Sequence, residues 1–320
     1  MEKTLKEKTT SAFTWSFIDK FGLQALTFII GIILARYYLT PSDYGLIGML
    51  AIFIALSGIL MDSGFSYAII RKKDMTDDDL NSVFYFNIAI SLLLYGILFF
   101  AAPYIASFYN QPMLIWICRA STLIILVNAS SNIQYALFLK ELRFRLIAVA
   151  NLSGLSVAVI AAFLMAVYGF GVWVLVWQNI IFITVRNIIL WFASKWKPGF
   201  TFKAASILSL WKFSAGVMLT GTLNTVFNNI FSLLIGKFYP LKEVGYYAQA
   251  NKFSELTSGT IGVTIQTVSY PVLSQIANDD ERFIRAYRKM IRVTSFLSFP
   301  ILFGLAAAAH PLIRVLLTDK

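Results

Sequence analysis

Long apolar stretches recur along nearly the whole chain and are separated by short polar connections. About nine of these stretches contain the roughly 20 mostly apolar residues that a helix needs to cross a bilayer. They cover residues 13–38, 44–70, 82–107, 113–139, 146–168, 171–194, 207–238, 246–276 and 294–317. Because the stretches are continuous rather than alternating, they predict an all-α, polytopic membrane protein and not a β-barrel.

The composition is that of a membrane protein. Of the 320 residues, 58% are hydrophobic and 13% are charged, and the mean hydropathy is +0.72. Soluble domains carry about 25% charged residues. One Cys excludes a disulfide framework, and one His argues against a Ser-His-Asp triad or a multi-histidine zinc site. Since no carboxylate pair or nucleophile–base pair stands out either, the sequence predicts a protein that is not an enzyme and needs no cofactor.

The lysines and arginines gather on alternate connections between the predicted spans. One set holds the N-terminal lysines before residue 9, the run Arg71–Lys73, the connection around Arg143, and the basic residues of 195–212 and 282–292. Short loops rich in Lys and Arg stay on the cytoplasmic side, so we expect a cytoplasmic N-terminus. This topology accounts for most of the formal net charge of +11, and we therefore expect no nucleic-acid partner.

Two turns about 200 residues apart resemble each other. They lie at residues 34–45 and 235–245, at the ends of the first and seventh predicted spans. With one gap, three pairs of positions align: Arg36 with Lys237, Asp43 with Glu243, and Gly45 with Gly245. Chance similarity between apolar segments is the alternative explanation. A repeat is favoured by the shared acidic residue and glycine, and six intervening spans would give both copies the same orientation.

Parallel repeats around a central site are typical of transporters. The repeat predicts a first six-helix bundle at residues 1–200 and an incomplete second bundle of three helices at residues 201–320. A second bundle that matched the first would need three further spans after residue 320. We therefore interpret the chain as part of a larger two-bundle architecture.

Charged side chains inside membrane helices cost about 2.5–3.5 kcal/mol each on insertion scales and so indicate cavities or pathways. The candidate substrate-binding residues are Asp19, Lys20, Asp62, Arg186, Lys252 and Glu255. Simpler explanations remain open. Lys20 lies near a helix end, from which its ammonium group can reach the interface. Asp62 can bond to the neighbouring backbone, and Lys252 and Glu255, three residues apart, can form an ion pair that only fixes packing.

Several short motifs occur in an order that is typical of one family. They are Leu39–Gly45, Asp62–Phe65, Arg71–Asp74, Ala136–Phe138, Arg143–Phe144, Tyr168–Trp173, Val244–Tyr247, Tyr270–Ser274 and Phe299–Pro300. With this series of motifs, the chain resembles the polysaccharide-exporter branch of the multidrug/oligosaccharidyl-lipid/polysaccharide superfamily. This branch contains the Wzx-like lipopolysaccharide and exopolysaccharide flippases.

The resemblance implies two six-helix bundles around a central cavity in the bacterial cytoplasmic membrane. It implies that an undecaprenyl-pyrophosphate-linked oligosaccharide moves from the inner to the outer leaflet by alternating access. Lys20, Arg186 and Lys252 would then hold the pyrophosphate, polar groups would hold the sugar, and the lipid tail would stay among the membrane lipids. Polysaccharide polymerase and chain-length proteins are further partners that the resemblance suggests.

Three other functions remain alternatives. An ion-coupled exporter of small molecules would favour acidic residues in the cavity. A membrane glycosyltransferase or polymerase would need a large outer loop with acidic residues or Arg, and the predicted outer loops are short. A non-transporting scaffold of a polysaccharide synthesis complex would need no substrate site at all.

Overall fold

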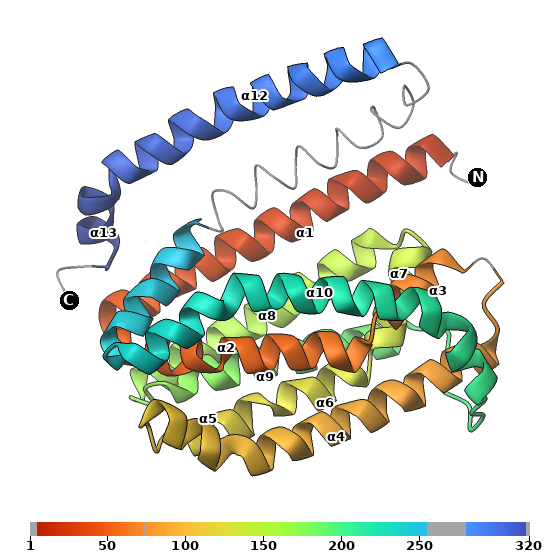
Figure 1. The fold of residues 1–320 in the computed structure, drawn as a ribbon, viewed down its shortest axis with the longest axis horizontal. Coiled ribbons are helices and arrows are strands. Elements are labelled where there is room, and N and C mark those ends of the chain that lie inside the picture. Colours follow the sequence, from red (N-terminus) through yellow and green to blue (C-terminus); the bar gives the residue numbers. More distant parts are fainter. Residues whose placement is uncertain (1–4, 73, 255–279, 318–320) are drawn as a thin grey trace. The chain divides into compact units, whose positions relative to one another are not determined.

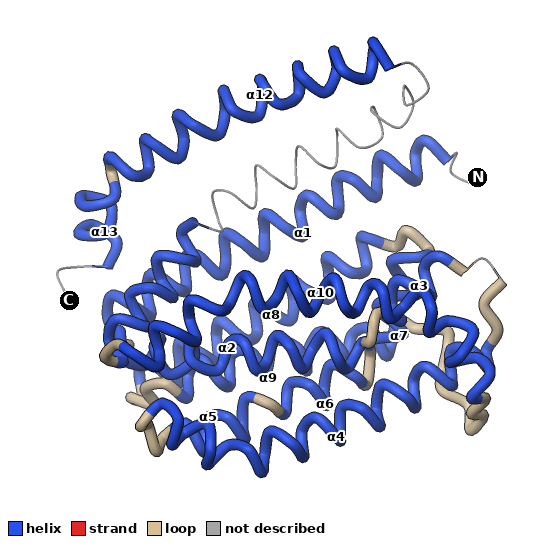
Figure 2. Tube along the Cα trace, in the orientation of Figure 1, coloured by secondary structure: helices blue, strands red, loops and turns tan. Residues whose placement is uncertain are grey.

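The computed structural model describes residues 5–72, 74–254 and 280–317, and every regular element in these ranges is helical (Figures 1 and 2). Within them the chain forms two compact units, Met1–Gly245 and Tyr246–Lys320, which are described separately. The predicted division into bundles at residues 1–200 and 201–320 stays a prediction.

The first unit contains most of the helices. They are α1 (Leu5–Ile33), the short π-helix η1 (Leu34–Tyr38), α2 (Pro41–Asp62), α3 (Phe65–Arg71), α4 (Asp77–Tyr109), α5 (Leu114–Ser121), α6 (Leu123–Ala129), α7 (Asn132–Lys140), α8 (Phe144–Val167), α9 (Trp173–Ala193) and α10 (Ala204–Phe238). Residues 241–254 are also helical. The second unit contains α12 (Asp280–Ala307) and α13 (Ala309–Leu317).

Among the described residues, six helical segments are long and apolar enough to cross a membrane. Two bent pairs, α5–α6 with α7 and α12 with α13, raise the number to as many as 8 if each pair forms one span. These elements coincide with eight of the predicted apolar stretches, and the ninth, 246–276, lies largely outside the described residues. The all-helical, multi-pass membrane fold is therefore confirmed.

Polar residues begin two of the spans where the sequence changes from loop to apolar helix. The Thr40 hydroxyl accepts a hydrogen bond from the Asp43 backbone N–H, and the Asp43 carboxylate accepts one from the Thr40 N–H at 2.8 Å. Thr76 and Asp79 form the same capping box at the start of α4. Each box satisfies N–H groups that the first turn of a helix leaves unpaired.

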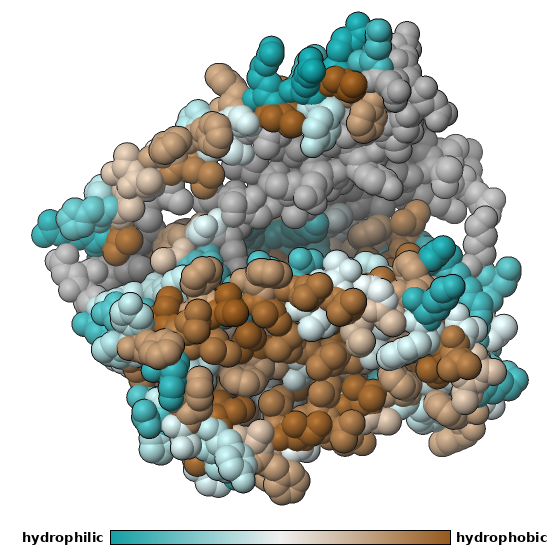
Figure 3. Space-filling model, viewed as in Figure 1, coloured by the Kyte–Doolittle hydropathy of each residue, from teal (hydrophilic) through white to brown (hydrophobic). Residues whose placement is uncertain are grey.

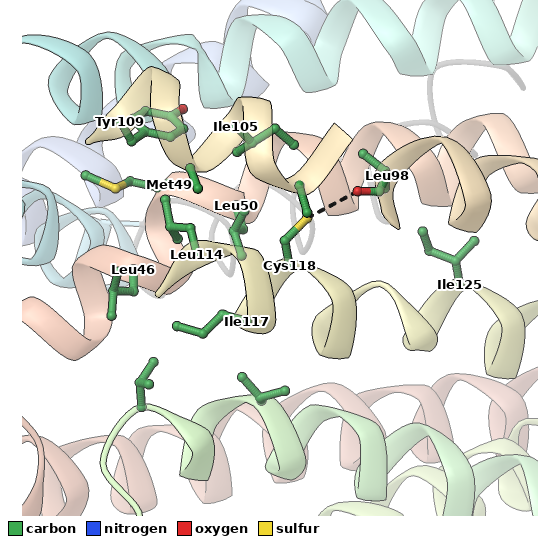
Figure 4. Packing of buried hydrophobic residues seen from close by; sticks show 14 of the residues in the cluster. Leu46, Met49, Leu50, Leu98, Ile105, Tyr109, Leu114, Ile117, Cys118 and Ile125 are labelled. Carbon is green, nitrogen blue, oxygen red and sulfur yellow. Dashed lines mark hydrogen bonds between the residues drawn. The ribbon is translucent and has the colours of Figure 1, made fainter. Parts of the chain in front are cut away.

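The largest core of the first unit joins α2, α4, α5, α6 and α9. Leu46, Met49 and Leu50 of α2 face apolar side chains of α4 and α5 (Figure 4). The buried Cys118 thiol belongs to this core, where its sulfur lies 4.0 Å from the Leu98 carbonyl oxygen. The single cysteine of the chain is thus part of the apolar packing.

The first unit also exposes many large apolar side chains. Phe100, Phe192 and Phe227 are 72–87% exposed although they lie within predicted spans. Figure 3 shows apolar side chains over the middle of the visible face of this unit and hydrophilic ones toward its two ends. A soluble protein rarely exposes apolar area on this scale, whereas a bilayer covers it.

The two similar turns of the sequence pack against each other within the first unit. Gly45 is the fifth residue of α2, and Gly245 is the fifth residue of the helix that begins at Leu241. A Cβ atom on Gly45 would collide with the Leu241 carbonyl oxygen, and one on Gly245 would lie 2.6 Å from the Pro41 carbonyl carbon. The contact is therefore reciprocal: the glycine of each helix touches the first residue of the other.

Candidate functional site

Arg186 lies inside α9 and is surrounded by neutral polar groups. Its Nη2 donates to Asn128 Oδ1 of α6 at 2.8 Å and to Asn187 Oδ1 at 3.1 Å. The guanidinium carbon also lies 5.6 Å from the ring centre of Tyr135 on α7. No carboxylate among the residues that the structure describes forms an ion pair with Arg186. A guanidinium that is held by amides retains its positive charge for an anionic ligand.

A close helix approach determines the position of Arg186. A Cβ atom on Gly154 of α8 would lie 2.9 Å from the Phe182 carbonyl oxygen and 3.2 Å from the Arg186 backbone nitrogen. Only glycine allows the backbones of α8 and α9 to come this close, as small residues do between membrane helices. Gly154 thus places α8 directly beside the Arg186 turn.

Asp19 of α1 is part of a neighbouring polar contact. Its two carboxylate oxygens accept from Asn151 Nδ2 of α8 at 3.0 and 3.1 Å. Asn151 lies three residues before Gly154, the residue of α8 that touches the Arg186 turn, so the two contacts lie on the same part of α8. Lys20, the next residue, is exposed. The structure thus brings Asp19 and Arg186 to the same polar region, which we call the Arg186 cluster: Asp19, Asn128, Tyr135, Asn151, Arg186 and Asn187.

Asp62 forms mainly structural contacts. Its Oδ1 accepts from the Ser66 hydroxyl at 2.5 Å, from the Ser66 backbone N–H at 3.2 Å and from Asn132 Nδ2 at 2.6 Å. These bonds fix the break between α2 and α3, where Ser63 and Gly64 have φ of 48° and 76°, and attach it to the start of α7. The bond from the Ser66 N–H is of the kind that the alternative explanation of Asp62 expects, and the assignment of Asp62 to a substrate site stays a prediction.

The helix break between α6 and α7 borders the Arg186 cluster. The two helices bend by 47° around Ser130 and Ser131. Residues of α9 bind carbonyl groups near the break: Asn187 Nδ2 donates to Val127 O at 2.5 Å and Trp191 Nε1 to Ser130 O at 2.9 Å. A groove of about 390 Å³ lies beside this break and includes Asn187 and Trp191 in its lining. Broken helices in membranes are typical of substrate sites.

The remaining predicted site residues lie in the second unit or outside the described residues. Lys252 is helical and belongs to the second unit, so its position relative to Arg186 is not defined. Glu255 lies outside the described residues, and the predicted Lys252–Glu255 pair therefore stays a prediction. In the described ranges, no group of three or more His, Cys, Asp or Glu residues is arranged to hold a metal ion.

Amide side chains were missed by the sequence analysis. Asn128, Asn132 and Asn151 each bind one of the predicted charged residues and lie in apolar stretches of the sequence. A buried amide without hydrogen bonds is costly, so an asparagine inside a membrane helix is itself a signal of a polar partner. Their spacing along the chain gives no indication of which charged residue each one meets.

Comparison with known proteins identifies the family. Residues 33–320 match the model of a family described as "Polysaccharide biosynthesis protein". The chain belongs to this family. The match covers most of the chain, and it confirms the resemblance that the order of the motifs indicates.

Curated relatives of this family member are biosynthesis proteins by name, and one of them is also named a transport protein. It is 29% identical over 318 residues to the succinoglycan biosynthesis transport protein ExoT of Rhizobium meliloti, and the aligned region is 99% of this chain and 64% of ExoT. It is 24% identical to the lipopolysaccharide biosynthesis protein WzxC of Escherichia coli, over 99% of this chain and 65% of WzxC. It is also 24% identical to the teichuronic acid biosynthesis protein TuaB of Bacillus subtilis, over 82% of this chain and 55% of TuaB. The chain thus spans less than two thirds of these three relatives.

Proposed function

We propose that this polysaccharide biosynthesis protein moves a lipid-linked oligosaccharide across the bacterial cytoplasmic membrane. The substrate would be an undecaprenyl-pyrophosphate-linked sugar unit, transferred from the inner to the outer leaflet for lipopolysaccharide or exopolysaccharide synthesis. The observation that carries the proposal is Arg186, a cation inside a membrane helix that is held by amides and has no acidic partner among the described residues.

The chemistry of the Arg186 cluster suits this substrate. A guanidinium group can donate two parallel hydrogen bonds to phosphate oxygens, which a diphosphate offers in abundance. The amides of Asn128 and Asn187 can both donate and accept, as sugar hydroxyl groups require. A small organic cation would need an available carboxylate. Asp19 already accepts hydrogen bonds from Asn151 and lies near the positive charge of Lys20. An exporter of anionic lipids is therefore favoured over an exporter of small cations.

Two further observations support alternating access by a two-bundle protein. The names of the relatives ExoT and WzxC associate them with transport and with polysaccharide biosynthesis rather than with bond cleavage. The reciprocal contact of Gly45 and Gly245 is the geometry that a two-fold repeat would produce. In the orientation that the basic loops predict, this contact closes the outer end, so the substrate would enter from the cytoplasmic side.

The proposal is tested by replacing Arg186 with Gln in the producing cell and measuring surface polysaccharide. Hydrogen bonds to charged groups contribute about 1.5–3 kcal/mol, so we expect export to fall about 10- to 100-fold. Arg119→Gln is the matched control. Arg119 also lies in a bent apolar region, but it donates to the Phe99 carbonyl at 3.3 Å and stacks on the Phe99 ring at 4.1 Å, outside the Arg186 cluster.

Both variants must reach the membrane in normal amounts, which quantitative immunoblotting of membrane fractions establishes. Loss of export with Arg186→Gln and normal export with Arg119→Gln supports the proposal. Normal export with Arg186→Gln refutes the assignment of Arg186 to the substrate site.

A further inference from the structure

A second cationic pocket lies between α3 and α10, in the first unit and away from the Arg186 cluster. It has a volume of about 290 Å³ and is lined by Ala68, Arg71, Lys72, Ser209, Leu210 and Phe213. We call it the Arg71 pocket. In the predicted topology this end of the unit faces the cytoplasm, because Arg71 and Lys72 begin one of the basic connections.

The arginine in this pocket is held in place by an aromatic ring. The Arg71 guanidinium carbon lies 4.4 Å from the ring centre of Phe213. Stacking fixes the plane of the guanidinium group but uses none of its five N–H donors, which remain available at its edge. Nowhere in the described part of the chain does a carboxylate pair with Arg71.

The neighbouring charges leave the pocket positive. Asp79 is paired with Lys72 at 2.5 Å, and Asp78 is paired with Lys203 at 2.5 Å. The hydrogen bond that Lys203 donates to the Asp78 carboxylate raises the pKa of Lys203, as expected for a lysine with an anionic partner. Lys140 instead donates to the Ile69 and Lys72 carbonyls at the end of α3. Asp78 and Asp79 of α4 are thus paired with lysines, and they do not compensate the charges of Arg71 and Lys140.

The apolar wall of the pocket indicates where the anion comes from. Leu210 and Phe213 line the pocket, and the exposed side chains Leu219, Leu223 and Phe227 follow further along α10. α10 crosses the front of the first unit in Figure 1, and the middle of the same region is apolar in Figure 3. A phosphorylated lipid could place its head group at Arg71 and its chain along α10, within the bilayer.

We propose that the Arg71 pocket binds the phosphate or diphosphate group of a polyprenyl lipid at the cytoplasmic end of the protein. The Arg71 N–H groups donate to the phosphate oxygens, the Lys72 ammonium group offers the N–H groups that its bond to Asp79 leaves unused, and α10 contacts the chain. The choice of a polyprenyl chain rests on the proposed function, but the site is a separate one, since binding at Arg71 requires neither translocation nor the Arg186 cluster.

The test measures binding to the whole protein purified from membranes, by native mass spectrometry. The probes are undecaprenyl diphosphate, undecaprenol without phosphate, and inorganic pyrophosphate. Arg71→Gln removes the charge, and we expect it to weaken binding of the phosphorylated probe about ten-fold or more. Arg145→Gln is the matched control, because Arg145 is also a basic residue near a predicted cytoplasmic helix end and stacks on the Trp15 ring at 5.5 Å.

The probes separate the two sources of phosphate. Loss of undecaprenyl diphosphate binding with Arg71→Gln, but not with Arg145→Gln, supports a lipid site. Loss of pyrophosphate binding alone supports the phosphate site but overturns its assignment to a lipid. Equal effects of the two variants, or equal binding of undecaprenol and its diphosphate, overturn the proposal.

A second, milder variant distinguishes a specific loss of binding from a loss caused by misfolding. Phe213→Leu keeps an apolar side chain but removes the ring that holds the guanidinium, so we expect a smaller loss than with Arg71→Gln. Unchanged binding with both Arg71→Gln and Phe213→Leu refutes the pocket. Since export through Arg186 is measured separately, failure of one proposal leaves the other intact.

Discussion

The contact between the two similar turns predicts a specific effect of Gly245→Ala. A Cβ atom at this position would lie 2.6 Å from the Pro41 carbonyl carbon and 3.1 Å from its Cα. Non-bonded carbon atoms prefer separations of about 3.5–4.0 Å. The starts of the two helices must therefore move apart by about 1 Å to accommodate one methyl group.

The energy of this movement follows from two opposing contributions. Adding a methyl group to a well-packed contact costs about 1–3 kcal/mol. Replacing glycine by alanine in a helix interior stabilises the helix by about 0.5–1 kcal/mol, whichever way the two turns are arranged. Since the helix stabilisation is the same in both arrangements, it cancels, and the net cost to the closed arrangement stays at about 1–3 kcal/mol. This cost corresponds to about a 5- to 150-fold shift toward an arrangement in which the turns are apart.

Thiol labelling measures this shift in intact cells. The single native cysteine, Cys118, is buried, so its thiol is shielded from the label. A cysteine introduced beside the contact by Ser42→Cys can therefore be labelled selectively. A membrane-impermeant maleimide is added from outside. We expect Gly245→Ala to raise the labelling rate of Ser42→Cys about 5- to 150-fold, and Gly45→Ala to act in the same direction because the contact is reciprocal.

Gly58→Ala is the matched control for the glycine substitution. Gly58 also lies in α2, and a Cβ atom there would meet no atom within 4 Å. The control gains the same helix stabilisation without the collision. Equal labelling rates in Gly245→Ala and Gly58→Ala would show that the contact does not close the outer end, and the proposed direction of substrate entry would then be wrong.

Three further predictions concern stability, packing and activity. Thr76→Ala removes the capping box of α4, and we expect a loss of about 0.5–2 kcal/mol, measured as a lower thermal unfolding midpoint than that of Ser42→Ala. Gly154→Val separates α8 from α9, and we expect it to reduce export even though Arg186 is unchanged; full export would refute the role of this close approach. The purified protein should release no sugar or phosphate from lipid-linked oligosaccharide. Release of sugar or phosphate that persists in an Arg186→Ala, Lys252→Ala double variant would argue for an enzyme.

The sequence predicted the helical elements well because their signal is local. Each apolar stretch of about 20 residues is long enough to cross a bilayer, and the backbone in lipid must satisfy its own hydrogen bonds. Helix starts such as those at Thr40 and Thr76 depend on residues three positions apart, so they too can be predicted from neighbouring residues. The break between α6 and α7 was not predicted, since residues 113–139 are apolar almost throughout.

The candidate site was predicted only in part. Arg186 and Asp19 were singled out because a charge in a membrane helix is costly, and they lie in one polar region of the structure. Asp62 was singled out by the same rule, yet its bonds to Ser66 and Asn132 hold a helix break together. The cost of burying a charge is the same whether the charge binds a ligand or fixes the fold, so sequence alone does not separate the two cases.

By itself, the sequence determined that this chain is a multi-pass helical membrane protein and which family it belongs to. Tertiary structure decided which polar groups meet: Arg186 with Asn128, Asp19 with Asn151, and Gly45 with Gly245 and Leu241. The physical reason is that these spans are apolar on all sides, because lipid covers whatever the protein does not. Apolar patterning therefore gives the length of each span but not its inward face, and only the packing of helices distant in sequence defines the site.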